Sequence, residues 1–291
     1  MQAELVLDIR AQLGEGPNWD IARQKLWWID GKKQKVCLYN PTDGSNIEHD
    51  LGHDLGTVVR REKGGLLVAR ANGVVTLDAE TGALEHLCDP EEHLPENRFN
   101  DGKCDPAGRF WFGSMENAEV NMDRGSLYCL DLDGTVEKKL EPVGISNGIV
   151  WTADKSTVYY IDSPTRRVDA FDYDDASGAI SNRRTAFELP DGIGFPDGMS
   201  IDSEGKLWIA LWDGFAVGHF DPLTGDLLGK VEVPVPHVSA CAFGGPAMDE
   251  LYITTARHLM EEHELTEYPQ SGGIFHAHVG VRGVPFEPYR G

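Results

Sequence analysis

The chain has 291 residues, of which 41% are hydrophobic and 9% aromatic, and it contains 33 Gly and 16 Pro. This apolar content is enough for a large core, so it excludes an intrinsically disordered chain and a small disulfide-stapled protein. Acidic residues outnumber basic residues by 48 to 26, which gives a net charge of −22. Such a surface repels phosphate backbones and anionic lipids. We therefore expect no nucleic-acid partner, no membrane partner and a monomeric protein.

The cysteines and the first residues bear on the cellular compartment. The five cysteines are widely spaced and form no CxxC pair, which argues against a disulfide framework and a thiolate zinc site. They are Cys37, Cys88, Cys104, Cys129 and Cys241. Residues 1–8 lack the basic and long apolar segments of a signal peptide, and no stretch approaches 18 apolar residues. We therefore expect a cytoplasmic protein.

A short apolar run, rich in aromatic and β-branched residues, recurs six times along the chain. The runs begin 40 to 49 residues apart. They are 26–30, 66–70, 110–114, 158–162, 207–211 and 251–255. Turns rich in Asp, Asn and Gly, such as 105–108 and 202–205, separate them from further alternating segments. Each unit is therefore expected to contain three or four antiparallel strands.

Repeats of about 45 residues with four strands each are typical of β-propeller blades. Six units occupy nearly the whole chain. The sequence therefore predicts an all-β, six-bladed β-propeller, with residues 1–291 forming a single domain. The ring closes if residues 5–7 add a strand beside residues 273–276, which also hides the sheet edges.

A polar residue followed by glycine precedes three of the six runs by ten or eleven residues. These residues are Glu15, Asn147 and Asp197, and the third unit has Asn100 or Asp101 at the matching place. The innermost strand of a blade lies beside the central channel, so residues at one fixed offset converge near the axis. Carboxylate and amide oxygens suit a hard divalent cation, and so few protein ligands leave positions for water or substrate. The pattern therefore predicts a metal site in the channel.

These segments also allow other interpretations. A single Asn-Gly or Asp-Gly is most often a turn, and only the repeated offset favours a site. Residues 144–148 match the G-x-S-x-G nucleophile elbow with Ser146, but that motif needs a strand-to-helix turn, and the residues that follow are strand-like. Residues 258–264 lack the H-E-x-x-H spacing and are expected to form a surface helix or loop.

Several longer motifs resemble those of one known family. They are Leu13–Pro17, Asn97–Gly102, Ile145–Gly148, Phe195–Gly198, Arg166–Tyr173, Cys241–Gly245 and Ser271–Phe275. The chain resembles the regucalcin (senescence marker protein)/gluconolactonase/luciferin-regenerating enzyme family over essentially its whole length. The resemblance implies a six-bladed propeller that hydrolyses sugar lactones with one divalent metal ion, which is Ca²⁺, Zn²⁺, Mn²⁺ or Mg²⁺.

The resemblance also implies roles for individual residues. The family's metal ligands correspond to Glu15, Asn147 and Asp197, in agreement with the offset pattern. Its catalytic acid/base carboxylate corresponds to Asp197. Its substrate-binding arginine and asparagine correspond to Arg98 and Asn100.

One substrate-contacting glutamate of the family does not carry over directly. It follows a segment that reads Gly113–Glu119 here, and strict counting places it on Ala118, between Glu116 and Glu119. We assign its role to Glu119, with Glu116 as the alternative. This assignment bears on which lactone the protein accepts and not on the reaction that it catalyses.

The expected activity is metal-dependent hydrolysis of a sugar lactone to the aldonic acid. Two alternatives stay open. One is an organophosphate-hydrolysing propeller of the diisopropyl-fluorophosphatase kind, and the other is a non-enzymatic calcium-binding or scaffold propeller. The sequence does not choose among gluconolactone, galactonolactone, xylonolactone and arabinolactone, which differ by single hydroxyl groups.

Overall fold

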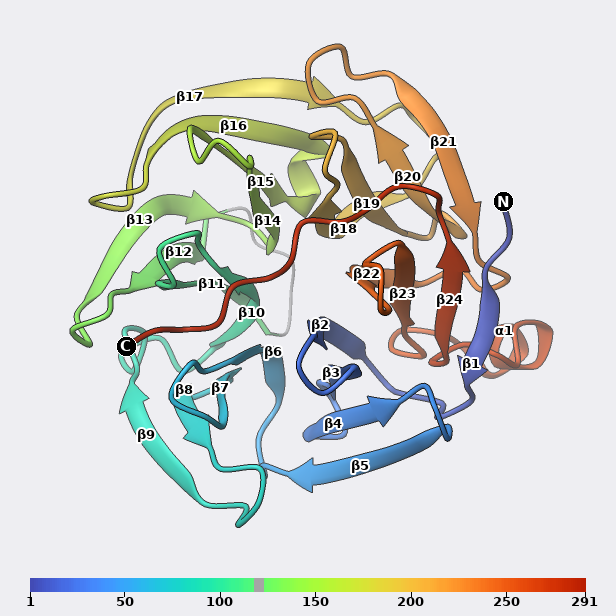
Figure 1. The fold of residues 1–291 in the computed structure, drawn as a ribbon, viewed down its shortest axis with the longest axis horizontal. Coiled ribbons are helices and arrows are strands. Elements are labelled where there is room, and N and C mark those ends of the chain that lie inside the picture. Colours follow the sequence, from blue (N-terminus) through green and yellow to red (C-terminus); the bar gives the residue numbers. More distant parts are fainter. Residues whose placement is uncertain (118–122) are drawn as a thin grey trace.

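The computed structural model describes residues 1–117 and 123–291. Six four-stranded antiparallel sheets surround a central axis (Figure 1). Each sheet is one blade, and its first strand lies nearest the axis. The prediction of an all-β, six-bladed propeller is therefore confirmed.

The first three blades follow one another along the chain, from the centre outward in each case. Blade 1 comprises β2 (Gly14–Asp20), β3 (Lys25–Asp30), β4 (Lys35–Asn40) and β5 (Ser45–Asp50). Blade 2 comprises β6 (Leu55–Arg60), β7 (Leu66–Arg70), β8 (Gly73–Leu77) and β9 (Leu84–Cys88). Blade 3 comprises β10 (Asn97–Cys104), β11 (Phe110–Glu116), β12 (Gly125–Leu130) and β13 (Val136–Val143).

The other three blades complete the ring. Blade 4 comprises β14 (Ser146–Trp151), β15 (Thr157–Asp162), β16 (Arg167–Asp174) and β17 (Ala179–Glu188), with the short 3₁₀ helix η1 (Ser163–Thr165) after β15. Blade 5 comprises β18 (Phe195–Ile201), β19 (Leu207–Trp212), β20 (Ala216–Phe220) and β21 (Leu227–Glu232). Blade 6 comprises β22 (Val238–Gly244), β23 (Glu250–Thr255), β24 (Ile274–His278) and β1 (Glu4–Leu7), and helix α1 (Glu262–Glu267) lies between β23 and β24.

The six apolar runs of the sequence form the second strand of each blade. They are almost entirely buried, because the neighbouring blades cover both faces of the sheet, whereas the outermost strands such as β5 and β9 are largely exposed. Six clusters of buried hydrophobic side chains lie between successive blades, one at each interface. Trp28, Trp111 and Trp208 belong to these clusters, as expected for side chains that pack sheet against sheet.

The N-terminal strand closes the ring. In Figure 1, β1 lies beside β24, and the two pair antiparallel with Leu5 opposite Phe275. The sheet order β1-β24-β23-β22 places a strand from each end of the chain in one blade. This closure, which the sequence analysis predicted, leaves each blade covered on both faces.

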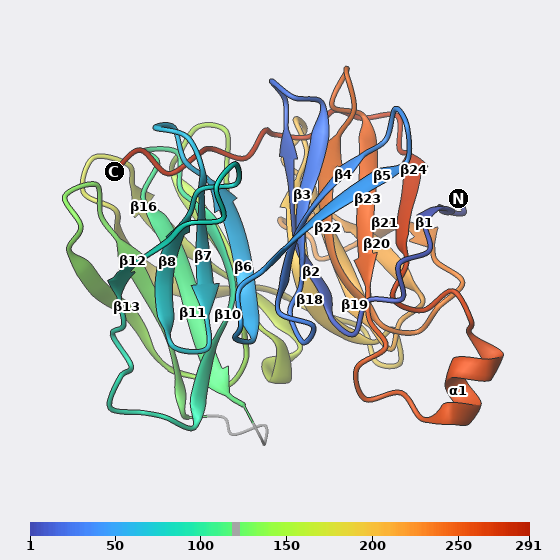
Figure 2. The same cartoon turned by 90° about the horizontal axis from the view of Figure 1, so that it is seen from below.

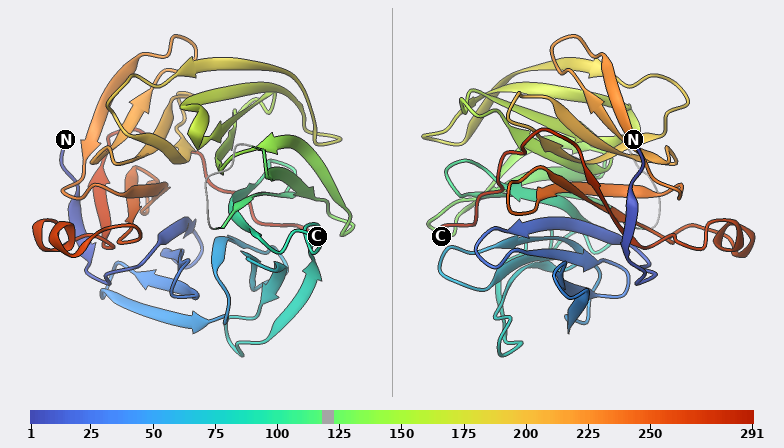
Figure 3. Two further views of the ribbon diagram at one scale, coloured as in Figure 1. Left: turned by 180° about the vertical axis from the view of Figure 1, so that it is seen from behind. Right: turned by 45° about the vertical axis from the view of Figure 1, so that its right-hand side comes forward.

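The last residues of the chain cross one face of the propeller (Figures 1 and 2). Backbone hydrogen bonds attach this segment to three blades in turn: Val284 N–H to Ile201 O, Tyr289 N–H to Arg60 O, and Arg290 N–H to Gly108 O. Helix α1 lies on the opposite side of the ring, at the rim of the face seen in Figure 3. In the part of the chain that the structure describes, no helix is long and apolar enough to cross a membrane.

Candidate functional site

The inner strands are irregular at the three predicted metal ligands. Pairing of each inner strand with its neighbour is interrupted just after Glu15 in β2, at Asn147 in β14 and at Asp197 in β18. Such bulges release a residue from the ladder and re-aim its side chain. Close packing explains why glycine follows the polar residue. A Cβ on Gly148, for example, would lie only 2.8 Å from the Asp197 carbonyl oxygen of the next blade. The polar-Gly pairs therefore let adjacent inner strands approach closely around the channel.

Three carboxylates lie buried at the same end of the channel. Glu15, Asp101 and Asp197 are each at most 9% exposed. Each accepts a hydrogen bond from the backbone N–H of the glycine that follows it, at 3.1 Å for Glu15 and 2.7 Å for Asp101. The structure thus brings together two predicted ligands from blades 1 and 5 and a third carboxylate from blade 3.

Burial and mutual repulsion make this group of carboxylates electrostatically unusual. Burial raises the pKa of Glu15 well above its usual value, and the charges of Asp197 and Asp101 raise it further. Burial, followed by the charge of Asp101, likewise raises the pKa of Asp197. The buried guanidinium of Arg98 opposes both shifts. Arg98 faces Glu15 and Asp197, and Lys103 faces Asp101. The carboxylates still outnumber these two cations, and a divalent cation would offset the remaining negative charge.

A chain of hydrogen bonds joins the predicted substrate-binding residues to the remaining ligand. Arg98 Nη1 donates to Asn100 Oδ1 (2.6 Å), and Asn100 Nδ2 donates to Asn147 Oδ1 (3.1 Å). Asn147 Nδ2 donates to Ser163 Oγ (2.7 Å), which in turn donates to Pro196 O (2.5 Å). The guanidinium at one end and the carbonyl at the other fix the orientation of both amides. The network spans blades 3, 4 and 5 and ends at the residue before Asp197.

Two aspartates that the sequence analysis did not single out hold the ligand-bearing loops. Asp162 accepts hydrogen bonds from the backbone N–H groups of residues 144–145, at 2.9 to 3.2 Å. Asp30 accepts them from residues 12–13, at 2.9 and 3.1 Å. Each pair of amides lies two or three residues before the predicted ligand of its blade. Both aspartates end an apolar run, and that shared position is the signal that could have revealed them.

Histidines and further charged groups lie on the same side of the propeller as Arg98. Burial lowers the pKa of His258, and the nearby charges of Lys32 and Arg98 lower it further. His237 is buried, and its Nε2 lies 3.0 Å from Asp213 Oδ1. His258 was assigned to a surface segment, and no spacing in the sequence connects it with Arg98.

The family glutamate is only partly located. Glu119, our assignment, and Ala118 lie outside the described residues. Glu116 is the last residue of β11, opposite Asn97 in the ladder, and its carboxylate lies 3.8 Å from Arg124 Nη2. Since Met115 is the residue opposite Arg98, Glu116 lies one position further along the same ladder.

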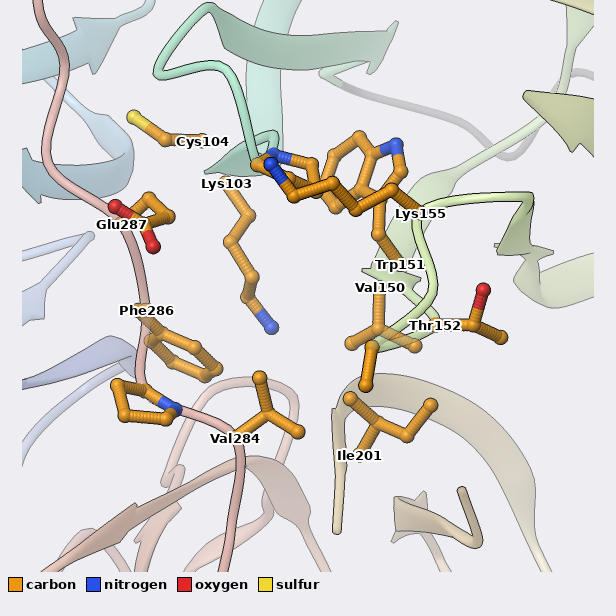
Figure 4. Close-up of a pocket in the computed structure, with 13 residues that line it drawn as sticks. Lys103, Cys104, Val150, Trp151, Thr152, Lys155, Ile201, Val284, Phe286 and Glu287 are labelled. Atoms are coloured by element: carbon orange, nitrogen blue, oxygen red, sulfur yellow. The ribbon is translucent and has the colours of Figure 1, made fainter. Parts of the chain in front are cut away.

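The other end of the channel is closed. Lys103 donates a hydrogen bond to Met199 O (2.6 Å), and its ammonium lies 4.0 Å from the centre of the Phe286 ring in the C-terminal segment. The void that remains between these residues and the inner strands is about 10 Å³. Beyond it lies a separate, mainly apolar cavity of about 210 Å³, lined by residues such as Val284 and Trp151 (Figure 4). The C-terminal segment therefore blocks access to the carboxylates from its own face.

Comparisons with known proteins show the family to which the chain belongs. The sequence model of the SMP-30/Gluconolactonase/LRE-like region matches residues 13–257. Regucalcin of Xenopus laevis is 40% identical over 289 residues, with 98% of this chain and 97% of that protein covered. YvrE of Bacillus subtilis (strain 168), provisionally named a sugar lactone lactonase, is 36% identical and covers 100% of this chain and 99% of its own.

A solved structure extends the likeness to three dimensions. The calcium-binding protein regucalcin of Agrobacterium tumefaciens superimposes with a TM-score of 0.94 at 28% identity, covering 100% of this chain and 97% of that one. The family model, the full-length relatives and the shared propeller all point the same way. The chain belongs to the SMP-30/gluconolactonase/LRE-like family.

Proposed function

We propose that this protein hydrolyses a sugar lactone to the aldonic acid with the help of one divalent metal ion held by Glu15, Asn147 and Asp197. The observation that carries the proposal is the buried group of three carboxylates beside Arg98 and two amides at one end of a channel that is closed at the other. Membership in a family named for gluconolactonases supports the reaction class.

The donor set fits a hard cation. Glu15 and Asp197 supply carboxylate oxygens, and Asn147 Oδ1 accepts one hydrogen bond from Asn100, which leaves its second lone pair available. All-oxygen sites of this kind accept Ca²⁺, Mg²⁺ or Mn²⁺, and carboxylates also bind Zn²⁺. When bound, the cation would act as a Lewis acid toward the lactone carbonyl.

Asp197 is our candidate for the general base. Its carboxylate is buried and lies beside Asp101, and both features raise its pKa in the metal-free protein. Beside the cation it would be placed to accept the proton of a water that the cation makes more acidic. We assign it the proton of the attacking water and assign the network ending at Pro196 O the task of holding its backbone.

Arg98 and Asn100 are our candidates for substrate binding. Among the described residues, the buried Arg98 Nε has no hydrogen-bond partner, so the protein does not use the full donor capacity of this guanidinium. Both N–H groups of Asn100 are engaged, with Ser146 O and Asn147 Oδ1, but its Oδ1 keeps one lone pair for a hydroxyl donor. Glu119, with Glu116 as the alternative, is proposed to contact the substrate from the neighbouring loop.

The charge of the protein suits this substrate class. A lactone is neutral and is not repelled by a chain of net charge −22, whereas the acid product is. We propose a monomer in the cytoplasm. All five cysteines are free thiols, as is usual in a reducing compartment.

The experiment is a panel of sugar lactones and one phosphotriester, assayed with a pH indicator before and after chelation and after return of each cation. We expect lactone hydrolysis that chelator abolishes and a cation restores, with circular dichroism unchanged because six packed blades hold the fold. Faster turnover of the phosphotriester would favour an organophosphatase. No cation-dependent turnover of any substrate would favour a binding or scaffold protein.

A further inference from the structure

A second group of potential metal ligands lies on the outer part of blade 6, away from the channel. Among the described residues, Glu250, His276 and His278 each offer a ligand atom, and these atoms all lie within 4.8 Å of one another. Glu250 belongs to β23, and the two histidines belong to β24. From these residues we propose a binding site for a late first-row divalent metal ion, with Zn²⁺ as the probe. The site is independent of the proposed lactonase function.

The sheet pairing places the three side chains on one face. His276 and His278 are two residues apart on β24, so both point to the same side of the sheet. Glu250 stands directly opposite His278 in the antiparallel ladder, and Tyr252 stands opposite His276. Two histidines on one strand and a carboxylate on its partner therefore meet without any change of backbone.

The Glu250 carboxylate is already held in place. Its Oε2 accepts a hydrogen bond from the Tyr252 hydroxyl (3.0 Å) and lies 3.1 Å from His276 Nε2. Gly245 leaves room for it, since a Cβ at Gly245 would collide with the carboxylate carbon. A metal ion would replace the contact between Glu250 and His276 by binding both atoms, with the proton on that imidazole nitrogen released.

The spacing and the type of the ligands select the metal. Ligand atoms around tetrahedral zinc lie about 3.3 Å apart, given Zn–N distances of about 2.0 Å. Glu250 and His276 already have this separation, and His278, which is exposed, can reach it by rotating its side chain. Two imidazoles and one carboxylate favour zinc and its neighbours over Ca²⁺ or Mg²⁺, which prefer oxygen ligands throughout. This separates the new site from the all-oxygen channel site.

The surroundings give an ion access and give the site a structural role. Glu250, Tyr252 and His276 line a cavity of about 500 Å³ between blades 6 and 1. In Figure 1, β24 lies between β23 and the N-terminal strand β1, and the long connection that carries α1 joins β23 to β24. The ligands lie at the end of the β23–β24 pair opposite this connection, so a bound ion would tie the start of β23 to the end of β24 in the blade that closes the ring.

The test measures zinc binding by calorimetry and thermal unfolding, with Ca²⁺ present in excess to occupy the channel. We expect the His276→Ala and His278→Ala variants each to bind one zinc ion fewer per chain than the wild type. Zinc should raise the melting temperature of the wild type and not that of either variant, because a ligand of the folded state stabilises it. Any zinc that enters the channel contributes equally to all of these proteins and cancels in the comparison.

His263→Ala is the matched control. His263 also lies beside a carboxylate, since its Nδ1 is 3.4 Å from Glu261 Oε2. It is exposed on α1, however, and among the described residues it belongs to no group of three potential metal ligands. This variant should bind zinc as the wild type does. An unchanged zinc count and an unchanged zinc-dependent shift in both His276→Ala and His278→Ala would overturn the proposal, whatever the lactonase assays show.

Discussion

Asn100 donates a hydrogen bond of 3.1 Å to the side-chain oxygen of Asn147, so a residue predicted to bind substrate is bonded directly to a residue predicted to bind metal. The two belong to blades 3 and 4, 47 positions apart in the chain. Arg98 orients the first of these amides, and Ser163 orients the second. The network therefore connects the two predicted sites, so a substitution on either side is best followed by measuring both substrate binding and cation binding.

Replacing Arg98 should separate substrate binding from cation binding. Arg98→Ala removes a donor to the sugar, and a charged hydrogen bond is worth about 1.5–3 kcal/mol, so KM should rise about 10- to 100-fold. Cation affinity should be unchanged or higher, because the guanidinium is a positive charge beside Glu15 and Asp197. Steady-state kinetics and calorimetric titration with Ca²⁺ measure the two effects. Arg98→Lys keeps the charge and should not show the gain in cation affinity. Weaker cation binding in Arg98→Ala would show that the arginine mainly supports the ligands.

Asp162 is expected to act as a positioning residue for the loop that carries Asn147. Asp162→Asn replaces one acceptor oxygen by a donor facing the amides of residues 144–145, and loss of such a supporting contact typically weakens metal binding about 10- to 100-fold. Excess cation should restore most of kcat, which distinguishes positioning from catalysis. Asp154→Asn, a change at an exposed turn aspartate, is the control and should leave cation affinity unaltered. Equal cation affinity in both variants would contradict the role given to Asp162.

Lys103 should make stability depend on pH in the alkaline range. Burial lowers its pKa from 10.5 to about 8, so between these values the unfolded chain holds a proton that the folded chain has lost. Stability therefore rises with pH, by up to about 1.4 kcal/mol per pH unit, and the contribution is lost as pH falls through 8. Between pH 8 and 10.5, we expect the free energy of unfolding of the wild type to increase relative to that of Lys103→Met, as measured by urea denaturation. Lys63→Met, at an exposed turn, should show no such pH-dependent difference. Parallel curves for wild type and Lys103→Met would show that this lysine titrates normally.

The fold could be predicted from the sequence because each blade repeats the same pattern of apolar runs and turns. Runs such as 26–30 are buried on both faces of a blade, so they must be apolar throughout, and they recur at a constant spacing. The convergence of Glu15, Asn147 and Asp197 was predictable for the same reason, since one offset from the run places all three on inner strands.

Other features could not be obtained from spacing. The bond between Asn100 and Asn147 and the supporting roles of Asp30 and Asp162 depend on side-chain orientation. The closure of the channel by Phe286 depends on where an irregular segment crosses the ring. Each of these contacts joins parts of the chain that the repeat does not place relative to one another. Only the three-dimensional structure shows them.

The most direct test of the account is the rate of lactone hydrolysis by Asp197→Asn at saturating cation, compared with wild type and with Asn147→Ala. The asparagine keeps an oxygen ligand but cannot accept a proton, and loss of a general base typically lowers the rate about 10²- to 10⁴-fold. We predict a kcat defect of this size that excess cation does not repair, while the same excess restores much of the activity of Asn147→Ala, which has lost only a neutral ligand. Recovery of Asp197→Asn to near the wild-type rate would contradict the account, and it would leave Asp197 as a ligand alone and Asp101 as the next candidate for the base.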